Sequence, residues 1–151
     1  MESAVVSALR QAAEPARVKN YQRFFKTGPG EYGEGDIFWG VTVPRQRAVA
    51  KQFKELPLPE IKALLCSPVH EHRLTALHIL VGQFERAEAK LQTTLYRFYL
   101  ANRTRINNWD LVDTSIPTLI GGVKPTDAWV KKMEKLLHSK TLWDRRIAML
   151  A

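Results

Sequence analysis

Two pairs of similar segments lie about 72 residues apart in this chain, and this repetition limits the folds that it can adopt. Residues 64–67 (Leu-Leu-Cys-Ser) resemble 136–139 (Leu-Leu-His-Ser) at an offset of 72. Residues 71–74 (Glu-His-Arg-Leu) resemble 144–147 (Asp-Arg-Arg-Ile) at an offset of 73. Half of this offset, roughly 36 residues, is a usual length for a repeat built from two helices. The pattern predicts stacked helix pairs, with chance similarity between amphipathic helices as the alternative.

Hydrophobic residues recur at helical spacing along most of the chain, and no segment alternates cleanly enough to predict a strand. We expect an all-α helical-repeat fold, an α-solenoid or α-α superhelix, as a single domain over residues 1–151. A long glycine-rich loop is predicted at 28–35. A helix is predicted to begin at Pro44 and to end at Pro57, and a short helix follows through Leu65. The other predicted helices are 3–13, 15–26, 70–85, 87–104, 109–120, 126–138 and 142–151.

The chain is basic, with 23 Lys and Arg residues against 15 Asp and Glu residues and a net charge of +8. Such an excess favours a polyanionic partner, first of all nucleic acid, although a basic surface also serves solubility alone. The single cysteine, Cys66, excludes an internal disulfide and a zinc–cysteine cluster and fits a reducing compartment. Because the N-terminus does not resemble a signal peptide and no apolar run reaches membrane-spanning length, we expect a soluble, cytoplasmic protein without a membrane partner.

Trp109 and Asp113 form the first candidate site, because residues four apart share one face of a helix. An aromatic ring attracts positive charge, and a carboxylate stabilises positive charge that builds during bond breaking. The alternative is a buried tryptophan beside a surface aspartate. Asp110 lies in the first turn of the same predicted helix, where a carboxylate favours the helix dipole, so we assign it a structural role.

Three arginines are candidates for contact with phosphate oxygens, which a guanidinium pairs with well. At the offset of 73, Arg73 matches Arg146, and the segment 109–113 lies midway between them. Equivalent positions of stacked repeats line up on one face, so we expect Arg73, this segment and Arg146 along one groove. Arg145 is a further candidate for DNA contact, and the alternative for all three is a solvated surface arginine.

Other chemistry-bearing residues favour structural interpretations. The histidines between residues 70 and 78 lack a Glu or Cys that would complete a metal site. The glycines at 28–35 have no Walker lysine at the required spacing and no preceding strand, so they do not predict a nucleotide cradle. Trp39 and Trp143 lie among aliphatic residues and are expected in the core. We expect neither a metal nor a cofactor.

Three segments resemble motifs of the AlkD-like DNA alkylation repair family, in the same order. Residues 108–121 (Asn-Trp-Asp-Leu-Val-Asp-Thr-Ser-Ile-Pro-Thr-Leu-Ile-Gly) resemble its W-D-x-V-D-x-x-x-P segment. Residues 142–148 (Leu-Trp-Asp-Arg-Arg-Ile-Ala) resemble its W-x-x-R-A/I-A segment one repeat later. Residues 32–44 (Tyr-Gly-Glu-Gly-Asp-Ile-Phe-Trp-Gly-Val-Thr-Val-Pro) resemble its glycine-rich loop leading into G-V-x-V-P, so the resemblance covers nearly the whole chain.

The resemblance implies a HEAT-like repeat fold whose concave surface holds double-stranded DNA, in a bacterial cytosol. Active members of that family hydrolyse the N-glycosidic bond of cationic N3- and N7-alkylated purines without flipping the base. By this resemblance, Asp113 is the catalytic carboxylate and Trp109 the aromatic that contacts the deoxyribose and backbone at the lesion. Arg146 is likewise the arginine that grips the DNA backbone nearby.

The sequence departs from the family at its end. The family has a further active-site aromatic in a repeat beyond the position of Arg146, whereas this sequence ends at Ala151 within a predicted helix. We therefore expect the N-terminal part of a longer family domain, with a short relative that dimerises or has lost activity as the alternative. The competing functions are a non-catalytic DNA-binding HEAT-like module and a protein-binding helical scaffold.

Overall fold

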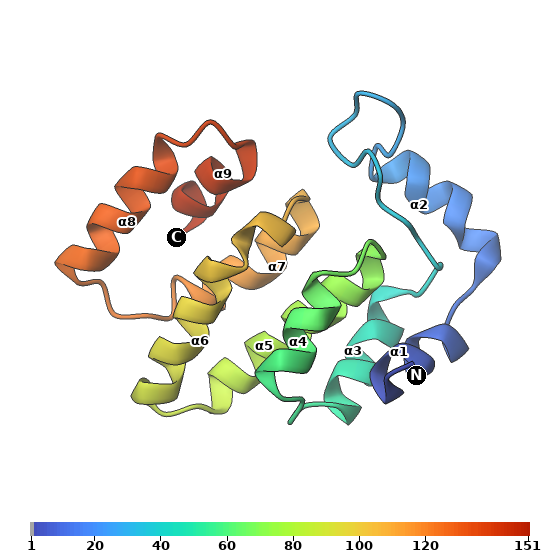
Figure 1. Cartoon of the computed structure of the whole chain (residues 1–151), viewed down its shortest axis with the longest axis horizontal. Helices are drawn as coiled ribbons and strands as arrows, with labels where there is room; N and C mark the ends of the chain where they lie inside the picture. Colours follow the sequence, from blue (N-terminus) through green and yellow to red (C-terminus); the bar gives the residue numbers. More distant parts are fainter. Residues whose placement is uncertain (1) are drawn as a thin grey trace. The chain divides into compact units, whose positions relative to one another are not determined.

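Nine α-helices and two 3₁₀ helices make up the regular structure of residues 2–151, the part of the chain that the computed structural model describes (Figure 1). In chain order they are α1 (Ala4–Gln11), the 3₁₀ helix η1 (Pro15–Arg17), α2 (Val18–Phe24), α3 (Val43–Gln52), α4 (Leu58–Leu65), α5 (His70–Arg86), α6 (Ala89–Ala101), the 3₁₀ helix η2 (Arg103–Arg105), α7 (Trp109–Leu119), α8 (Asp127–Leu137) and α9 (Leu142–Leu150). Within these residues the β-type pairing is one isolated bridge between Ile37 and Val69. The expected all-α, HEAT-like helical-repeat fold is confirmed.

The helices group into two compact units. One unit ends at Gly82 and the other runs from Gln83 to Ala151, so the division falls within α5. The expectation of one continuous repeat domain over 1–151 stays a prediction. Across residues 2–151, no helix combines the length and the apolar character that crossing a bilayer requires.

An acid on α5 fixes the segment that precedes α3 in the first unit. Oε1 of Glu71 accepts hydrogen bonds from the backbone N–H groups of Trp39, Gly40 and Val41, at 3.0, 2.8 and 3.2 Å. Gly40 has a φ of 82°, and a Cβ there would lie 2.0 Å from the carbonyl oxygen of Glu14. Only glycine therefore fits this part of the predicted G-V-x-V-P segment.

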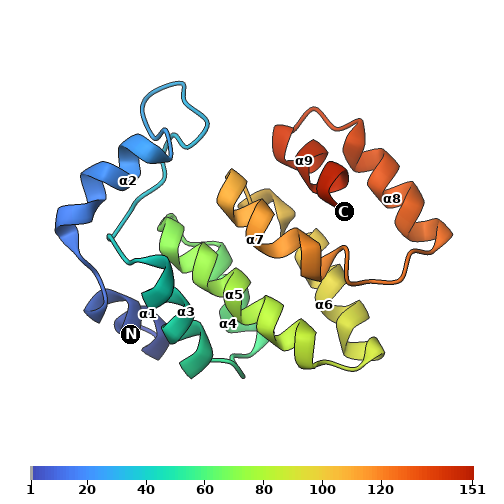
Figure 2. The same ribbon diagram turned by 180° about the vertical axis from the view of Figure 1, so that it is seen from behind.

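The first unit has an apolar core that several helices share. α1 packs against α3, and Figure 2 shows these two helices side by side. Fully or almost fully buried side chains come from α1, the segment before α3, α4 and α5: Val5, Leu9, Val41, Ile61, Leu65, Leu77 and Leu80. Each such side chain contributes roughly 1.5–3 kcal/mol through its removal from water.

The second unit is built around α7. α9 contacts both α7 and α8, and α6 contacts α7 (Figures 1 and 2). Tyr99 on α6 and Ser115 on α7 are both buried, and their hydroxyl oxygens lie 2.8 Å apart. Burial raises the pKa of the Tyr99 phenol, which keeps it neutral. Leu95, Leu111, Val112, Ile116, Leu119, Leu136 and Ile147 complete this core.

Several helix ends differ from the predicted ones for local reasons. The helix predicted to run to residue 104 ends at Ala101, because the side-chain amide of Asn102 donates to the Phe98 carbonyl oxygen at 2.8 Å. The helix from Pro44 ends at Gln52, five residues before Pro57, so Pro57 does not end it. The predicted caps are present: the side chains of Asn108 and Thr126 accept from the first-turn amides of α7 and α8.

Candidate active site

One face of α7 carries the candidate carboxylate. Val112 and Ile116 point into the core and are fully buried, whereas the side chain of Asp113 between them is 39% exposed. This is the consequence of helical periodicity, which turns neighbouring positions to different faces. Asp113 therefore lies at the surface of the second unit, with its carboxylate accessible to a ligand.

Asp113 is held by an arginine from the next helix. Nε and Nη2 of Arg146 on α9 donate to Oδ1 and Oδ2 of Asp113, at 2.8 and 2.7 Å. This two-point pairing is the strong geometry for a guanidinium and a carboxylate, and it raises the pKa of Arg146 further above its usual value. The structure thus brings together two of the residues singled out from the sequence.

Trp109 begins α7 one helical turn before Asp113. Its backbone N–H donates to Oδ1 of Asn108 at 2.8 Å, and Asn108 is fully buried. The indole is half-buried. Asp110 accepts from the backbone N–H of Leu111 at 2.8 Å, in agreement with a structural role in the first turn. The start of α7, and with it the position of the indole, therefore depends on the Asn108 cap.

A proline within α7 changes the backbone next to the carboxylate. Pro117 lies four residues after Asp113 and has no N–H. In an α-helix, the N–H of residue 117 would donate to the carbonyl oxygen of Asp113, so this oxygen lacks its usual donor within the helix. This places a further partial negative charge on the same turn as the carboxylate.

Arg145 supports the turn before α9. Its Nη1 donates to the carbonyl oxygens of Ser139 and Lys140, at 2.7 and 3.0 Å, and the residue is half-buried. Two of its donors therefore stabilise the connection between α8 and α9. Contact between DNA and the remaining N–H donors of Arg145 stays a prediction.

Arg73 lies in a buried polar cluster of the first unit. Its Nη2 donates to Oδ1 of Asp36 at 2.6 Å, and Nδ1 of His70 lies 2.8 Å from Oδ2 of the same carboxylate. These three side chains are only 7%, 6% and 2% exposed. Burial opposes the charge on Asp36, but His70 and Arg73 outweigh it and keep the pKa of Asp36 below its usual value. A guanidinium in this position has little surface to offer to a phosphate.

The hydrogen bonds also correct the register of the internal repetition. Nη1 of Arg73 donates to the carbonyl oxygen of Ser67 at 3.5 Å, as Nη1 of Arg145 does to that of Ser139 at 2.7 Å. Both serine–serine and arginine–arginine offsets are then 72 (139 − 67 and 145 − 73). The alignment of Arg73 with Arg146 at an offset of 73 was wrong.

The same turn recurs in further detail at this offset. Oγ of Ser67 accepts from the amide of Val69, and Oγ of Ser139 accepts from that of Thr141, both at 3.1 Å. Ser67 pairs with the side chain five residues later, Nδ1 of His72, at 2.8 Å, and Ser139 pairs with Oδ2 of Asp144 at 2.9 Å. Adjacent arginines at 145 and 146 made the register ambiguous in sequence.

The tryptophans expected in the core are half-buried instead. The guanidinium of Arg10 lies 4.3 Å from the ring centroid of Trp39, and the edge of His72 meets the same indole at a centroid distance of 4.4 Å. Trp39 therefore combines a packing role with a cation–π contact. Trp143 is the second residue of α9 and precedes Asp144, which accepts from Nε of Arg103 at 3.1 Å.

The comparisons with known proteins give one match. A family model described as "DNA alkylation repair enzyme" matches residues 5–151, which is nearly the whole chain. No curated protein and no solved structure matches the chain.

Proposed function

Because the chain belongs to the DNA alkylation repair enzyme family, we propose that it acts as a DNA glycosylase on cationic N3- and N7-alkylated purines. The reaction is hydrolysis of the N-glycosidic bond in double-stranded DNA. Family membership supports a role in repair of alkylated DNA. The glycosylase assignment is carried by one observation: an exposed carboxylate on α7, one turn after a tryptophan and paired with an arginine of α9.

The chemistry suits a carboxylate that stays ionised. Alkylation at N3 or N7 makes the purine cationic, so it leaves without being protonated by an acid. The enzyme then has to stabilise the positive charge that develops on the sugar, which a nearby carboxylate does. It also has to orient the attacking water molecule, which the same carboxylate can do. Trp109 would offer its ring face to the polarised C–H groups of the sugar.

The ion pair leaves both partners with capacity for a ligand. An ionised carboxylate has about four lone-pair positions, and Arg146 occupies two of those on Asp113. A guanidinium carries five N–H donors, of which Asp113 receives two. Arg146 can therefore hold a phosphate of the DNA backbone while it orients Asp113. We assign Arg145 to the same backbone through its remaining donors.

Excision without base flipping also agrees with this position. The side chain of Asp113 is 39% exposed on the helix face, so a sugar can approach it from outside the protein. A base-shaped cavity at the carboxylate is then unnecessary. Bulky lesions are expected to be substrates for the same reason.

The test is release of 7-methylguanine or 3-methyladenine from methylated duplex DNA. Asp113→Asn keeps the shape of the side chain and removes its charge, so release is expected to be lost while duplex binding remains. Asp127→Asn, an exposed acid in the first turn of α8, serves as the matched control and is expected to retain release. Normal excision by Asp113→Asn would show that the role assigned to Asp113 is wrong.

A non-catalytic DNA-binding module is the second candidate. The observation that favours it is that both carboxylate oxygens of Asp113 already accept from Arg146. Salt-dependent binding of duplex DNA without release of any base would select this function. Failure to bind duplex DNA even at low salt would instead favour a protein-binding scaffold.

A further inference from the structure

A pocket of about 670 Å³ lies between α6 and α8 in the second unit and is also lined by the loop that joins α7 to α8. This volume is within the range of small-molecule sites in proteins. Gly122 forms part of the loop wall, and a Cβ there would lie 2.3 Å from the carbonyl oxygen of Thr118 and 2.8 Å from the ring of Phe84. The loop therefore keeps this path only with glycine at position 122.

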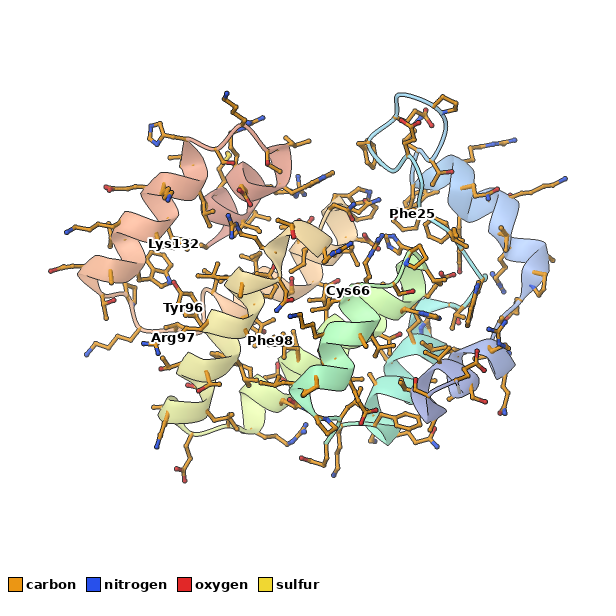
Figure 3. The ribbon with its side chains drawn as sticks, viewed as in Figure 1. Phe25, Cys66, Tyr96, Arg97, Phe98 and Lys132 are labelled. Carbon is orange, nitrogen blue, oxygen red and sulfur yellow. The ribbon has the colours of Figure 1, made fainter. Side chains whose placement is uncertain are left out.

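Two aromatic side chains line the pocket, Tyr96 from α6 and Trp129 from α8. Figure 3 shows Tyr96 on the side of α6 toward α8. Both residues are half-buried, and burial raises the pKa of the Tyr96 phenol, which keeps it a neutral hydrogen-bond donor. Nε1 of Trp129 is buried and has no hydrogen-bond partner. An indole N–H can only donate, and this one lacks an acceptor within the described residues.

Three cationic side chains line the same pocket, Arg97, Lys124 and Lys132. Figure 3 shows Arg97 beside Tyr96 on α6 and Lys132 on α8. No acidic residue is among the lining residues, and within residues 2–151 none of the three cations is in an ion pair. Such uncompensated positive charge beside a concave aromatic surface favours an anionic ligand.

The pocket is separate from the candidate active site. Its lining residues come from α6, from the loop after α7 and from the first turns of α8. None belongs to α7 or α9, which carry Asp113 and Arg146. A ligand here would leave the carboxylate and its arginine free for another partner.

We propose that this pocket binds one unpaired nucleotide, with the base against Tyr96 and Trp129 and the phosphate on Arg97, Lys124 and Lys132. Aromatic side chains interleaved with basic ones are the usual means of holding unpaired nucleotides, since every base has a face that stacks. The nucleotide comes either as a free monophosphate or as one unit of a single strand.

The experiment follows the indole N–H signal of Trp129 in the ¹⁵N-labelled full chain, identified by its loss in Trp129→Phe. The probes are thymidine 5′-monophosphate, an oligothymidine, thymidine and inorganic phosphate. We expect the signal to shift with the monophosphate and with the oligomer, and phosphate alone to bind at least about tenfold more weakly than the monophosphate. If the oligomer binds more tightly than the monophosphate, the natural ligand is a single strand. If the two bind equally, the natural ligand is the free nucleotide.

Variants separate the pocket from the rest of the surface. Arg97→Ala and Lys132→Ala are each expected to weaken binding of the monophosphate about tenfold, the usual effect of losing one hydrogen bond to a charged group. Lys131→Ala, the neighbouring exposed lysine of α8 that does not line the pocket, is the matched control and should bind normally. Helical circular dichroism checks that each variant is folded.

Two results would overturn the proposal. One is a Trp129 signal that neither the monophosphate nor the oligomer moves, and the other is equal binding of inorganic phosphate and monophosphate. The outcome is independent of the glycosylase proposal, since Asp113→Asn is expected to bind the monophosphate as well as the unchanged chain does. Lys132→Ala is in turn expected to release methylated bases at the normal rate.

Discussion

Arg146 on α9 donates two hydrogen bonds to Asp113 on α7, at 2.8 and 2.7 Å, while both side chains remain about 40% exposed. An exposed pair of this kind contributes little to stability, about 0–1 kcal/mol. The pair fixes the orientation of the carboxylate, and its own loss should affect function more than folding.

Replacement of Arg146 by alanine is expected to lower base release roughly tenfold or more, since one charge-assisted contact is lost and the carboxylate is no longer oriented. The slope of duplex affinity against salt concentration should fall by about 0.9, the value for one phosphate contact. Lys135→Ala, which removes an exposed charge from α8, is the control. An unchanged salt slope in Arg146→Ala would show that this arginine does not contact a DNA phosphate.

Replacement of Arg73 by methionine is expected to destabilise the first unit by about 3 kcal/mol, because the buried carboxylate of Asp36 loses its guanidinium partner. Urea unfolding measures this change. Duplex binding by the folded variant should be normal, since the arginine is only 7% exposed. A stable variant that binds DNA poorly would restore the DNA-contact role that the sequence suggested.

His72 should make stability depend on pH in the mildly acidic range. Burial first, and then the charge of Arg10, lower the pKa of His72 from 6.5 to about 4. Below pH 6.5 the unfolded chain takes up a proton that the folded chain excludes until about pH 4. Folding stability is therefore full above pH 6.5 and falls by about 3 kcal/mol as the pH drops through this window.

The measurement is the free energy of unfolding between pH 7 and pH 4, compared for the unchanged chain and His72→Gln. The variant should lack this part of the decline. His138→Gln, an exposed histidine that follows α8, should keep the full decline. An equal decline in all three proteins would contradict a neutral, buried His72.

Asn108→Ala is expected to cost about 1–2 kcal/mol of stability, because the first amide of α7 loses its cap. Base release should fall as well, since Trp109 follows the cap directly and its indole would no longer be held in place. Asn108→Ser keeps an accepting oxygen without burying a charge and should retain most of both properties. Thermal unfolding and release of 7-methylguanine measure the two effects, and a loss in Asn108→Ser as large as that in Asn108→Ala would contradict a capping role.

The sequence predicted the class of fold and placed Trp109 and Asp113 on one helix, because both depend on local periodicity. Helical spacing alone placed Trp109 and Asp113 one turn apart, and the Asn108 and Thr126 caps follow from side chains that accept from nearby amides. The pairing of Asp113 with Arg146 joins residues 33 positions apart. The internal repetition and the motif resemblance both placed these two residues in one groove, but neither predicted that they pair.

Other features depend on tertiary contacts that periodicity does not encode. The Asp36 carboxylate lies in a loop 37 positions before Arg73, so nothing local showed that this arginine is buried. The offset of 73 selected Arg146 as the match of Arg73, and only the hydrogen bond to Ser139 showed that Arg145 is the equivalent residue. The sequence did not indicate the pocket between Tyr96 and Trp129, because each helix contributes only some of its lining residues.

The three amides that Glu71 collects have a consequence for local opening of the first unit. The N–H groups of Trp39, Gly40 and Val41 are consecutive and all donate to one carboxylate oxygen, with Gly40 at a φ of 82°. Hydrogen bonds to a charged acceptor are about twice as strong as those to a neutral one. Glu71→Gln would weaken all three at once, and its signature would be faster exchange of these amide protons with solvent rather than simple loss of helix.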